Sequence, residues 1–477
     1  MPRVTIPMTQ GFYESYSLPI SAQRCQNMFI HNTGFGEALV SVAGVRLEVT
    51  TGEDIGSSNR GLHNKGGLVY AVNKQKLYRV DKTEVSPSTF KYTTTELGDI
   101  TGSGTVKMAD NGSQLLILNS SGEGWIYNED ADTPFQAITD PDFIANGTPT
   151  DVVFLDGYFV LSTSDKKIIV SSLNDGLSYD ALDFSSAESD PDAISALQVV
   201  NNQLIVIGEE TTEVFTNRGG SAFPFQRING LVINIGTTAS NSVVKVGQSF
   251  FMLGSSGTGS DTAYLFNGNS YQEVANPGIA RLIEESDISE ASSTSYGYLG
   301  SEFAACSFGG TTIVYDTKTG KWHERNVTTE RGSVTRSAIN NAVEAYGDLV
   351  VGSAFSGAIG VMSLNEFKDF GINIKRVVSS PRFSDQLVRK SVPRIEVLAE
   401  TGETRANQQE PVLSMSISKD GGKTYGNLRG RTLGAEGQFG KRVVWRRNGS
   451  FRKGFVVYLE TDADAKIVLI EMVADIL

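Results

Sequence analysis

Four residues near the C-terminal end of the sequence have side chains and a spacing that suit either a turn or a catalytic site. Ser418, Asp420, Gly422 and Thr424 occupy alternate positions in SISKDGGKTYG, residues 416–426. The carboxylate of Asp420 can accept backbone N–H groups across a turn, Gly422 tolerates a positive φ angle, and the Thr424 hydroxyl can bond back to the loop. We therefore predict that these residues close a hairpin, a structural role that needs no substrate.

The pattern S-x-D-x-G-x-T followed by an aromatic residue is the Asp-box, a turn frequent in sialidases and other β-propeller glycosidases. A carbohydrate-binding or carbohydrate-active, sialidase-like propeller is therefore an alternative function. Such an enzyme also needs three arginines around the propeller centre and carboxylates at defined separations in space, and the sequence does not identify them. A single Asp-box supports that alternative weakly, so we expect no catalytic residues.

A second group of candidate residues is acidic. Glu188, Asp190 and Asp192 lie within five residues in SSAESDPDAISAL. Three carboxylates so close together could bind Ca²⁺. They could equally serve turns, with Asp190 as the N-cap of a short helix that begins at Pro191. The sequence favours capping and leaves the metal site open as an alternative.

Other motifs of catalysis or cofactor binding are missing from the sequence. His31, His63 and His323 have no metal-ligand spacing, and there is no G-x-S-x-G, G-x-G-x-x-G or Walker motif. We expect no cofactor, and we expect His323, in KWHER, on a surface strand. The two cysteines, Cys25 and Cys306, are too few for a disulfide scaffold or a zinc site.

The stretch GKRVVWRRNGSFRKG, residues 440–454, is basic and contains no acid. Three roles fit it: contact with nucleic acid, a hairpin whose charged face meets solvent while residues 443–445 pack partly inward, or an interface with an acidic protein. Its candidate interface residues are Lys441, Arg442, Trp445, Arg446, Arg447, Arg452 and Lys453.

The elements that must position these residues are β-strands. Fifty glycines and few helical patterns indicate an all-β chain. A unit of turn, apolar strand, turn and aromatic-bearing strand recurs seven times at intervals of 44 to 56 residues, starting at Gly66, Asn111, Leu155, Val200, Val246, Glu302 and Tyr346. This period matches the blade of a β-propeller, so we predict six or seven blades over residues 46–370.

The longest interval of the repeat contains the helix signal NPGIARLIEESDISEASS. Asn276 is a suitable N-cap, Pro277 suits the first helical position, and Ile279, Leu282 and Ile283 would share the buried face. We predict a helix inserted between two blades.

The segments outside the repeat differ from it. Residues 1–45 contain three prolines and are expected to form an extended arm, whereas residues 371–477 show strand patterns typical of a small antiparallel β domain. The last 107 residues contain 18 Lys and Arg and 12 Asp and Glu, a net charge of +6. Because the whole chain has a net charge of −13, the first 370 residues have a net charge of −19. This asymmetry suggests two regions with different partners. Neither a signal peptide nor a membrane-spanning run is expected from the sequence.

Three stretches of the chain resemble the packaged DNA stabilisation proteins of short-tailed bacteriophages, which form the tail hub or nozzle. The first is SAQRCQNMFI, with Arg24 and Asn27, and the third runs from the Asp-box through KRVVWRR to FRKGFVVYLE. The second is AESDPDAISALQVVNNQLIVIGEETTEVF, in which Glu188, Asp192, Gly208 and Glu213 fit the family pattern.

The resemblance implies a virion protein, made in the host cytoplasm, that assembles as a homohexamer below a ring of head-to-tail adaptor proteins. It also implies that packaged DNA is retained in an axial channel without sequence recognition, and that tail fibres or tailspikes and a tail needle or plug attach to the protein.

A propeller that acts as a scaffold for protein partners in a cell is a third possible class of function.

The basic stretch is expected to dock on protein rather than grip DNA, because DNA must slide through a tail and a ring of basic grips would hold it. Trp445 is expected to be the apolar anchor of that interface.

Overall fold

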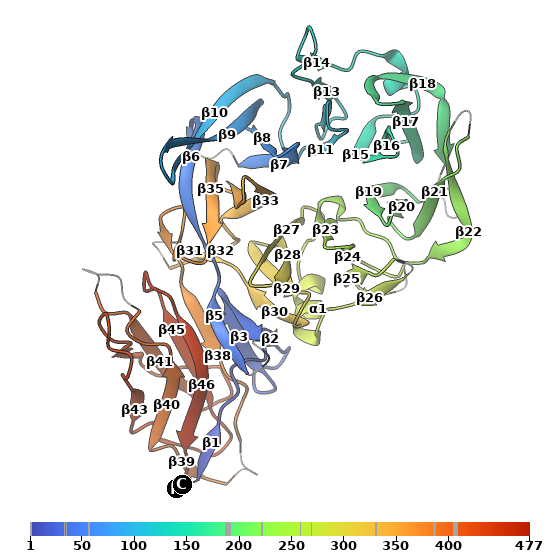
Figure 1. Ribbon diagram of the computed structural model, residues 1–477. Coiled ribbons are helices and arrows are strands. Elements are labelled where there is room, and N and C mark those ends of the chain that lie inside the picture. Colours follow the sequence, from blue (N-terminus) through green and yellow to red (C-terminus); the bar gives the residue numbers. More distant parts are fainter. Residues whose placement is uncertain are drawn as a thin grey trace.

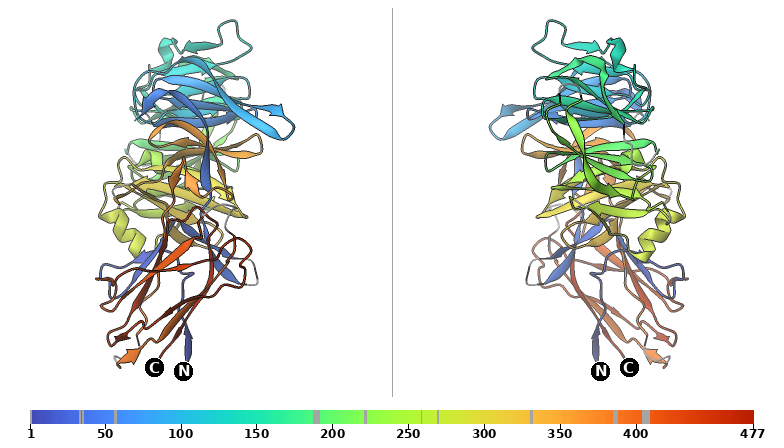
Figure 2. Two further views of the ribbon diagram at one scale, coloured as in Figure 1. Left: turned by 90° about the vertical axis from the view of Figure 1, so that its left-hand side faces the viewer. Right: turned by 90° about the vertical axis from the view of Figure 1, so that its right-hand side faces the viewer.

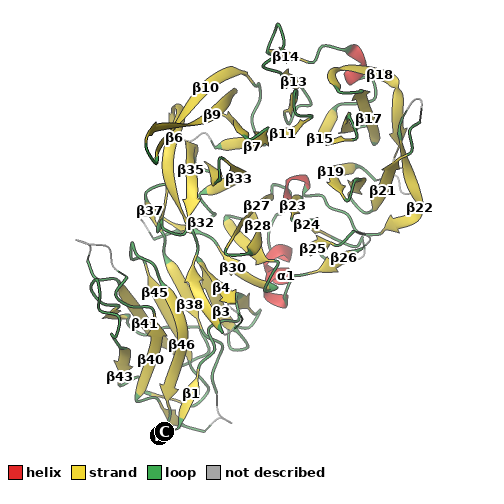
Figure 3. Ribbon diagram, viewed as in Figure 1, coloured by secondary structure: helices red, strands yellow, loops and turns green. Residues whose placement is uncertain are grey.

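The computed structural model describes residues 2–32, 34, 36–55, 58–186, 192–220, 223–257, 259–268, 270–329, 332–384, 388–403 and 409–477. Its strands form a β-propeller and a β-sandwich, and the few helical turns are short (Figures 1 and 3). Figure 2 shows an elongated molecule with the propeller at one end and both chain termini at the far end of the sandwich.

Seven sheets around a common centre make up the propeller in the described ranges. Blade 1 contains β7 (Asn59–Lys65), β8 (Leu68–Asn73), β9 (Lys76–Ser86) and β10 (Thr89–Asp99), and blade 2 contains β11 (Lys107–Asp110), β12 (Leu115–Leu118), β13 (Gly124–Tyr127) and β14 (Phe135–Ala137). Blade 3 contains β15 (Pro149–Leu155), β16 (Tyr158–Thr163), β17 (Lys167–Ser172) and β18 (Asp175–Ser186), and blade 4 contains β19 (Ile194–Val200), β20 (Gln203–Gly208), β21 (Thr212–Asn217) and β22 (Phe225–Ile233).

The remaining blades follow the same order from the inside outward. Blade 5 contains β23 (Val244–Val246), β24 (Ser249–Gly254), β25 (Thr262–Phe266) and β26 (Tyr271–Glu273), and blade 6 contains β27 (Ser292–Tyr298), β28 (Ser301–Phe308), β29 (Thr311–Asp316) and β30 (Lys321–Glu324). Blade 7 contains β33 (Ile339–Ala345), β34 (Asp348–Ser353) and β35 (Ser356–Ser363), and its outer strand is β6 (Gly44–Ile55) from near the N-terminus. The N-terminal strand therefore closes the ring of blades.

The repeat in the sequence coincides with the first hairpin of each blade. The turns there hold residues at positive φ, for example Asp156 and Gly157 in blade 3 or Tyr346 and Gly347 in blade 7. Such turns match the twist of two paired strands. Separate apolar clusters lie between neighbouring blades, as between blades 2 and 3 or blades 3 and 4, so these blades bury their faces against their neighbours. The propeller prediction is confirmed, and the described blades number seven.

The predicted helix is present as α1 (Pro277–Glu284), between blades 5 and 6. Asn276 is its N-cap, and the side-chain oxygen accepts from the backbone N–H groups of Gly278 and Ile279. Ile279 and Ile283 are buried, whereas Leu282 is only partly buried. Two 3₁₀ turns, η1 (Pro141–Phe143) and η2 (Ser240–Ser242), and the short hairpins β31 (Val327–Thr328) with β32 (Val334–Thr335) and β36 (Lys368–Asp369) with β37 (Ile372–Asn373) complete this part.

Two sheets form the sandwich. One joins β4 (Met28–Asn32), β5 (Glu37–Ser41), β46 (Val468–Asp475), β40 (Arg394–Ala399) and β43 (Val443–Arg446), with β1 (Arg3–Thr5) beside β46. The other joins β3 (Ala22–Gln26), β38 (Arg376–Ser379), β45 (Val456–Thr461), β41 (Val412–Ser418) and β42 (Arg429–Thr432), with β2 (Tyr13–Glu14) beside β3. A small ladder pairs β39 (Lys390–Ser391) with β44 (Ser450–Phe451).

The N-terminal segment is extended, but its strands are built into both domains. β1, β3, β4 and β5 join the sandwich, and β6, which begins one residue before the expected boundary at residue 45, belongs to the propeller. β3 also pairs with β30 of blade 6 at Gln26 and Glu324. A continuous sheet of ten strands therefore runs from the propeller into the sandwich.

Candidate assembly site at the joint between propeller and sandwich

An ion pair spans the joint where β3 lies between the two domains. The guanidinium of Arg24 donates to both carboxylate oxygens of Glu324, at 3.1 and 2.8 Å, and to the side-chain oxygen of Gln26 at 3.1 Å. Two parallel bonds fix orientation as well as distance. Burial alone would lower the pKa of Arg24, but Glu324 more than offsets it and the pKa lies above its ordinary value. The pair holds β3 against blade 6.

Asn27 bonds to both domains from a single amide. Its side-chain nitrogen donates to the carbonyl of Asn326 at 2.8 Å, in the propeller, and to that of Lys375 at 2.7 Å, just before the sandwich strand β38. Its side-chain oxygen accepts from the backbone N–H of Asn326 at 3.0 Å. Asn27 is buried and has a φ of 55°, a conformation that asparagine tolerates better than most residues. Arg24 and Asn27, predicted from the sequence as one signature, therefore both act at the joint.

A second buried ion pair lies next to the first. Arg325 donates to Asp369 at 2.9 Å and to the carbonyl of Ala43 at 2.9 Å. Burial raises the pKa of Asp369, and the charges of Arg325 and Arg376 oppose this rise. Arg376 is buried as well, and burial lowers its pKa to about 10. The sequence does not single out these residues, because a charged residue within an apolar strand is also typical of a strand with one face in solvent.

His323 also lies in this region. The prediction of a surface position is wrong: its imidazole is 2% exposed and packs against the rings of Phe29 and Phe303. Burial first, and then the neighbouring charge of Arg325, lower its pKa to about 3. The imidazole is therefore neutral and is part of the core of the joint.

The Asp-box turn is near the same joint, on the sandwich side. Asp420 accepts from the backbone N–H groups of Lys423 and Thr424 at 3.1 and 3.0 Å and from the Thr424 hydroxyl at 2.6 Å. The Ser418 hydroxyl bonds Asp420 at 2.6 Å, and it accepts from the N–H of Gly422 at 2.8 Å. These donors, the Ser418 hydroxyl first, hold the pKa of Asp420 well below its ordinary value.

The turn packs against the N-terminal segment through its glycines. Gly422 has a φ of 97°, and a Cβ there would lie 2.4 Å from the Cβ of Ala22 in β3. A Cβ on Gly421 would lie 2.8 Å from Pro19. The internal bonds of the turn and its close contact with β3 together account for the motif without a ligand.

The second signature stretch is in blade 4, away from the joint. Asp192 accepts from the backbone N–H groups of Glu210 and Thr211 at 2.8 and 2.9 Å, which closes the turn between β20 and β21. A Cβ on Gly208 would lie 2.3 Å from the Asp192 carboxylate, so only glycine fits. Glu213 is buried in β21 and lies 3.4 Å from Arg227.

Several predictions for this stretch fall outside the described residues. Glu188 and Asp190, and with them the proposed N-cap before Pro191, lie in residues 187–191. Among the residues that the structure does describe, no three His, Cys, Asp or Glu side chains are grouped as metal ligands would be.

The basic stretch forms the outer edge of the sandwich. Lys441 pairs with Glu410 at 2.9 Å, and Arg442 pairs with Glu396 through two bonds of 2.7 and 3.0 Å. The exposed charged residues of the stretch are Arg442, Arg446, Arg447, Arg452 and Lys453. Arg446 and Arg447 form no ion pair with any residue inside the described ranges.

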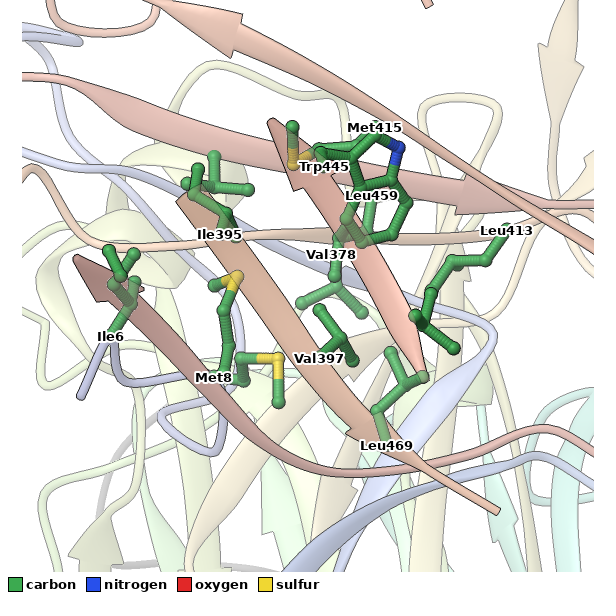
Figure 4. Close-up of a cluster of buried hydrophobic side chains, with 14 of the residues drawn as sticks. Ile6, Met8, Val378, Ile395, Val397, Leu413, Met415, Trp445, Leu459 and Leu469 are labelled. Atoms are coloured by element: carbon green, nitrogen blue, oxygen red, sulfur yellow. The ribbon is translucent and has the colours of Figure 1, made fainter. Parts of the chain in front are cut away.

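The prediction that Trp445 is a surface anchor is wrong. Its indole is fully buried among Met415, Leu459 and Ile395 in the sandwich core, and its N–H donates to the carbonyl of Arg429 at 2.6 Å (Figure 4). Alternation along β43 places Val443 and Trp445 inward, so Arg446 points outward.

The centre of the propeller holds a cavity of about 700 Å³ that is lined by the inner strands. His63 and Asp110 lie 2.6 Å apart on its wall. The other charged residues that line it are Lys107, Asp151, Lys245 and Glu344, and no arginine lines the cavity among the described residues. The three arginines that a sialidase-like centre needs are not brought together there.

Comparison with known protein families gives two matches. The family model described as bacteriophage P22 Gp10, beta-propeller, matches residues 4–366, and the one described as bacteriophage P22 Gp10, beta-sandwich, matches residues 375–476. A comparison with curated proteins gave no match. No helix in the described part of the chain is long and apolar enough to cross a membrane.

Two solved structures illustrate what the chain resembles in shape. The WD40 beta propeller domain of Doa1 is 13% identical, with 67% of this chain and 97% of that chain covered and a TM-score of 0.41. The extracellular domain of the putative hybrid two-component system BT4673 from B. thetaiotaomicron is 10% identical, with 78% and 42% covered and a TM-score of 0.42.

Proposed function

The chain belongs to the bacteriophage P22 Gp10 family, the tail hub or nozzle proteins that stabilise packaged DNA, and on that basis we propose that it is the tail hub of a short-tailed phage. The family is one of structural phage tail proteins and not an enzyme family, which makes the chain a structural component of the virion that assembles with other tail proteins. The proposal adds a hexameric ring that extends the DNA channel below the head-to-tail adaptor ring.

The remaining parts of the proposal concern DNA and attached proteins. The ring retains packaged DNA through its channel without reading sequence, and it anchors tail fibres or tailspikes and a tail needle or plug. The chain is made in the host cytoplasm before it enters the virion. An acidic propeller suits a channel wall, because negative charge lets a duplex slide rather than bind.

One observation carries the proposal: the joint makes the propeller and the sandwich one mechanical unit. The ten-stranded sheet passes through it, and the pair Arg24–Glu324 ties the sandwich strand β3 to blade 6 of the propeller. Two domains that share only a small interface would be free to move relative to each other. A component that holds a pressurised genome must instead transmit force between its attachment surfaces without bending.

The test is assembly of the purified chain and retention of DNA in particles. Native mass spectrometry and electron microscopy should show rings of six copies, and particles that lack the protein should lose their DNA after packaging. Rings with another number of copies would refute the hexamer. Particles that keep their DNA without the protein would refute the retention role and leave the ring intact.

A further inference from the structure

Charge is separated along the length of the molecule. Blades 2 and 3, residues 107–186, contain 13 Asp and Glu but only three Lys and no Arg, whereas the chain after residue 370 has a net charge of +6. Figure 1 places these two blades, β11 to β18, at the end of the propeller that is far from the sandwich strands β40 and β43. The molecule therefore has an acidic end and a basic end.

The acidic end carries an exposed apolar patch on the outer strand of blade 3. Asp180, Leu182 and Phe184 alternate toward solvent on β18, with Leu182 77% and Phe184 38% exposed. Ile144, 61% exposed, lies on the neighbouring loop, which bonds β18 through Asn146 and the carbonyl of Ala181. We call Ile144, Asp180, Leu182, Asp183 and Phe184 the blade-3 face. Apolar side chains of this size in a group mark interaction surfaces.

One cation, Lys167, already lies against this face, with its Nζ 4.4 Å from the centre of the Phe184 ring. Two features favour a further positive charge there. Burial and the neighbouring carboxylate of Asp180 raise the pKa of Asp183, which means that its surroundings disfavour the negatively charged form. Beside the face, a groove of about 530 Å³ between blades 2 and 3 is lined by Ile144 together with the acids Glu123 and Asp165. A positively charged group beside Asp180 and Asp183 would relieve the repulsion between their two carboxylates.

The basic end carries a matching surface at the open edge of the sandwich. Arg429 and Arg431 on β42 reach across to β43 and donate to the carbonyls of Arg446 and Val444 at 3.1 and 2.9 Å. They cover the backbone of an edge strand but gain no carboxylate partner among the described residues. Burial and the nearby charge of Arg431 lower the pKa of Arg429. With Arg446 and Arg447, these residues form what we call the arginine edge.

We propose that the arginine edge of one copy of this chain docks on the blade-3 face of a second copy. This inference rests on the proposed ring and specifies its interface. The two surfaces differ, so the contact is head to tail, and a head-to-tail contact repeated by a closing rotation makes a ring. Arginines without carboxylate partners meet carboxylates that repel each other, and Leu182 and Phe184 supply the apolar centre that such interfaces need.

The experiment exchanges charge between the two surfaces. One variant carries Arg446→Glu and Arg447→Glu, and the other carries Asp180→Lys and Asp183→Lys. Ring formation is followed by sedimentation velocity and native mass spectrometry at increasing protein concentration. Each variant alone should need about tenfold more protein or more to assemble, because every interface then brings like charges together. Lys419→Glu with Lys423→Glu, on the exposed Asp-box turn, changes net charge equally and should assemble as the wild type does.

The decisive result comes from mixing. An equal mixture of the two variants should form rings again, since alternating copies present Arg to Asp at one interface and Glu to Lys at the next. A single chain with all four changes should also assemble. Rings that form normally from either variant, or variants that fail to rescue each other, would refute the proposed interface but not the proposed ring. A wild-type chain that stays monomeric would contradict both proposals, and lost DNA binding with intact rings would assign the arginine edge to phosphate instead.

Discussion

Arg24 and Glu324 lie 300 residues apart in the sequence and form a two-bond ion pair across the joint. Glu324 is the more enclosed partner, with 9% of its side chain exposed against 33% for Arg24. Loss of the arginine would leave a buried carboxylate without its counter-charge, which costs more than the pair itself contributes. The pair is therefore a point where the joint can be weakened selectively.

We expect Arg24→Ala to lower the free energy of unfolding by about 2 to 3 kcal/mol, a value reduced for the partial exposure of Arg24. Glu324→Gln should also destabilise, and the double variant should lose less than the sum, by about 1 kcal/mol. Urea unfolding followed by circular dichroism measures all three. Lys466→Ala, which breaks the exposed pair with Glu400, is the control and should cost about 0.5 kcal/mol or less. Strictly additive losses would show that the two side chains do not interact.

His323 should make the protein less stable in acid. Because its folded pKa is about 3 and the ordinary value is about 6.5, the unfolded chain binds a proton below pH 6.5 that the folded chain does not. The free energy of unfolding should therefore fall as the pH drops from about 6.5 toward 3, by about 1.4 kcal/mol per pH unit from this group. His323→Gln should flatten the slope between about pH 6.5 and 5, where few carboxylates titrate.

Denaturant unfolding at a series of pH values measures this slope. His31→Gln, which removes a partly buried histidine elsewhere, is the matched control. An unchanged slope in His323→Gln would mean that the imidazole is protonated in the folded protein.

Two glycines in the sandwich should respond differently to alanine. Gly437 has a φ of 80° with no atom within 4 Å of an added Cβ, so Gly437→Ala should cost only the backbone strain of about 1 kcal/mol. Gly422→Ala adds a clash with Ala22 and should cost about 1 to 3 kcal/mol more. Thermal unfolding of the two variants compares them, and limited proteolysis shows whether β3 is released in Gly422→Ala. Equal losses would place the Asp-box turn away from β3.

Trp445→Ala should destabilise the sandwich by about 3 to 5 kcal/mol, because it leaves a large cavity and an unpaired carbonyl at Arg429. Arg447→Ala, two residues along and exposed, should change stability by about 0.5 kcal/mol or less. Denaturant unfolding compares the two. A Trp445→Ala variant of normal stability that fails to assemble would restore the surface role that its burial excludes.

The local features of the fold could be predicted from the sequence. The period of the apolar strands identified the blades, since each begins with a tight hairpin, and Asn276 and Pro277 marked the start of α1. These signals lie within a few residues of one another. The bonds within the Asp-box turn are local for the same reason.

The joint could not be predicted in this way because its partners are distant in sequence. Nothing near Arg24 indicates that Glu324 will face it, and Asn27 meets Lys375 only after the whole propeller has formed. Trp445 and His323 were misplaced for a related reason. Both have charged neighbours that suggest a surface strand, and only the packing of opposite sheets shows that alternate residues are enclosed.

The closure of blade 7 by β6 also sets when the protein can finish folding during synthesis. β6 ends at Ile55, but its partner β35 spans Ser356–Ser363. In the same way, β1 can pair only after β46, Val468–Asp475, has been synthesised. At about 5 to 20 residues per second, a ribosome needs on the order of 15 to 60 s to pass from one closing strand of the propeller to the other. Throughout that time the first strand has an unpaired edge. Chains that end before Ser356 lack the partner altogether, so their propeller stays open and they cannot reach the closed, seven-bladed fold.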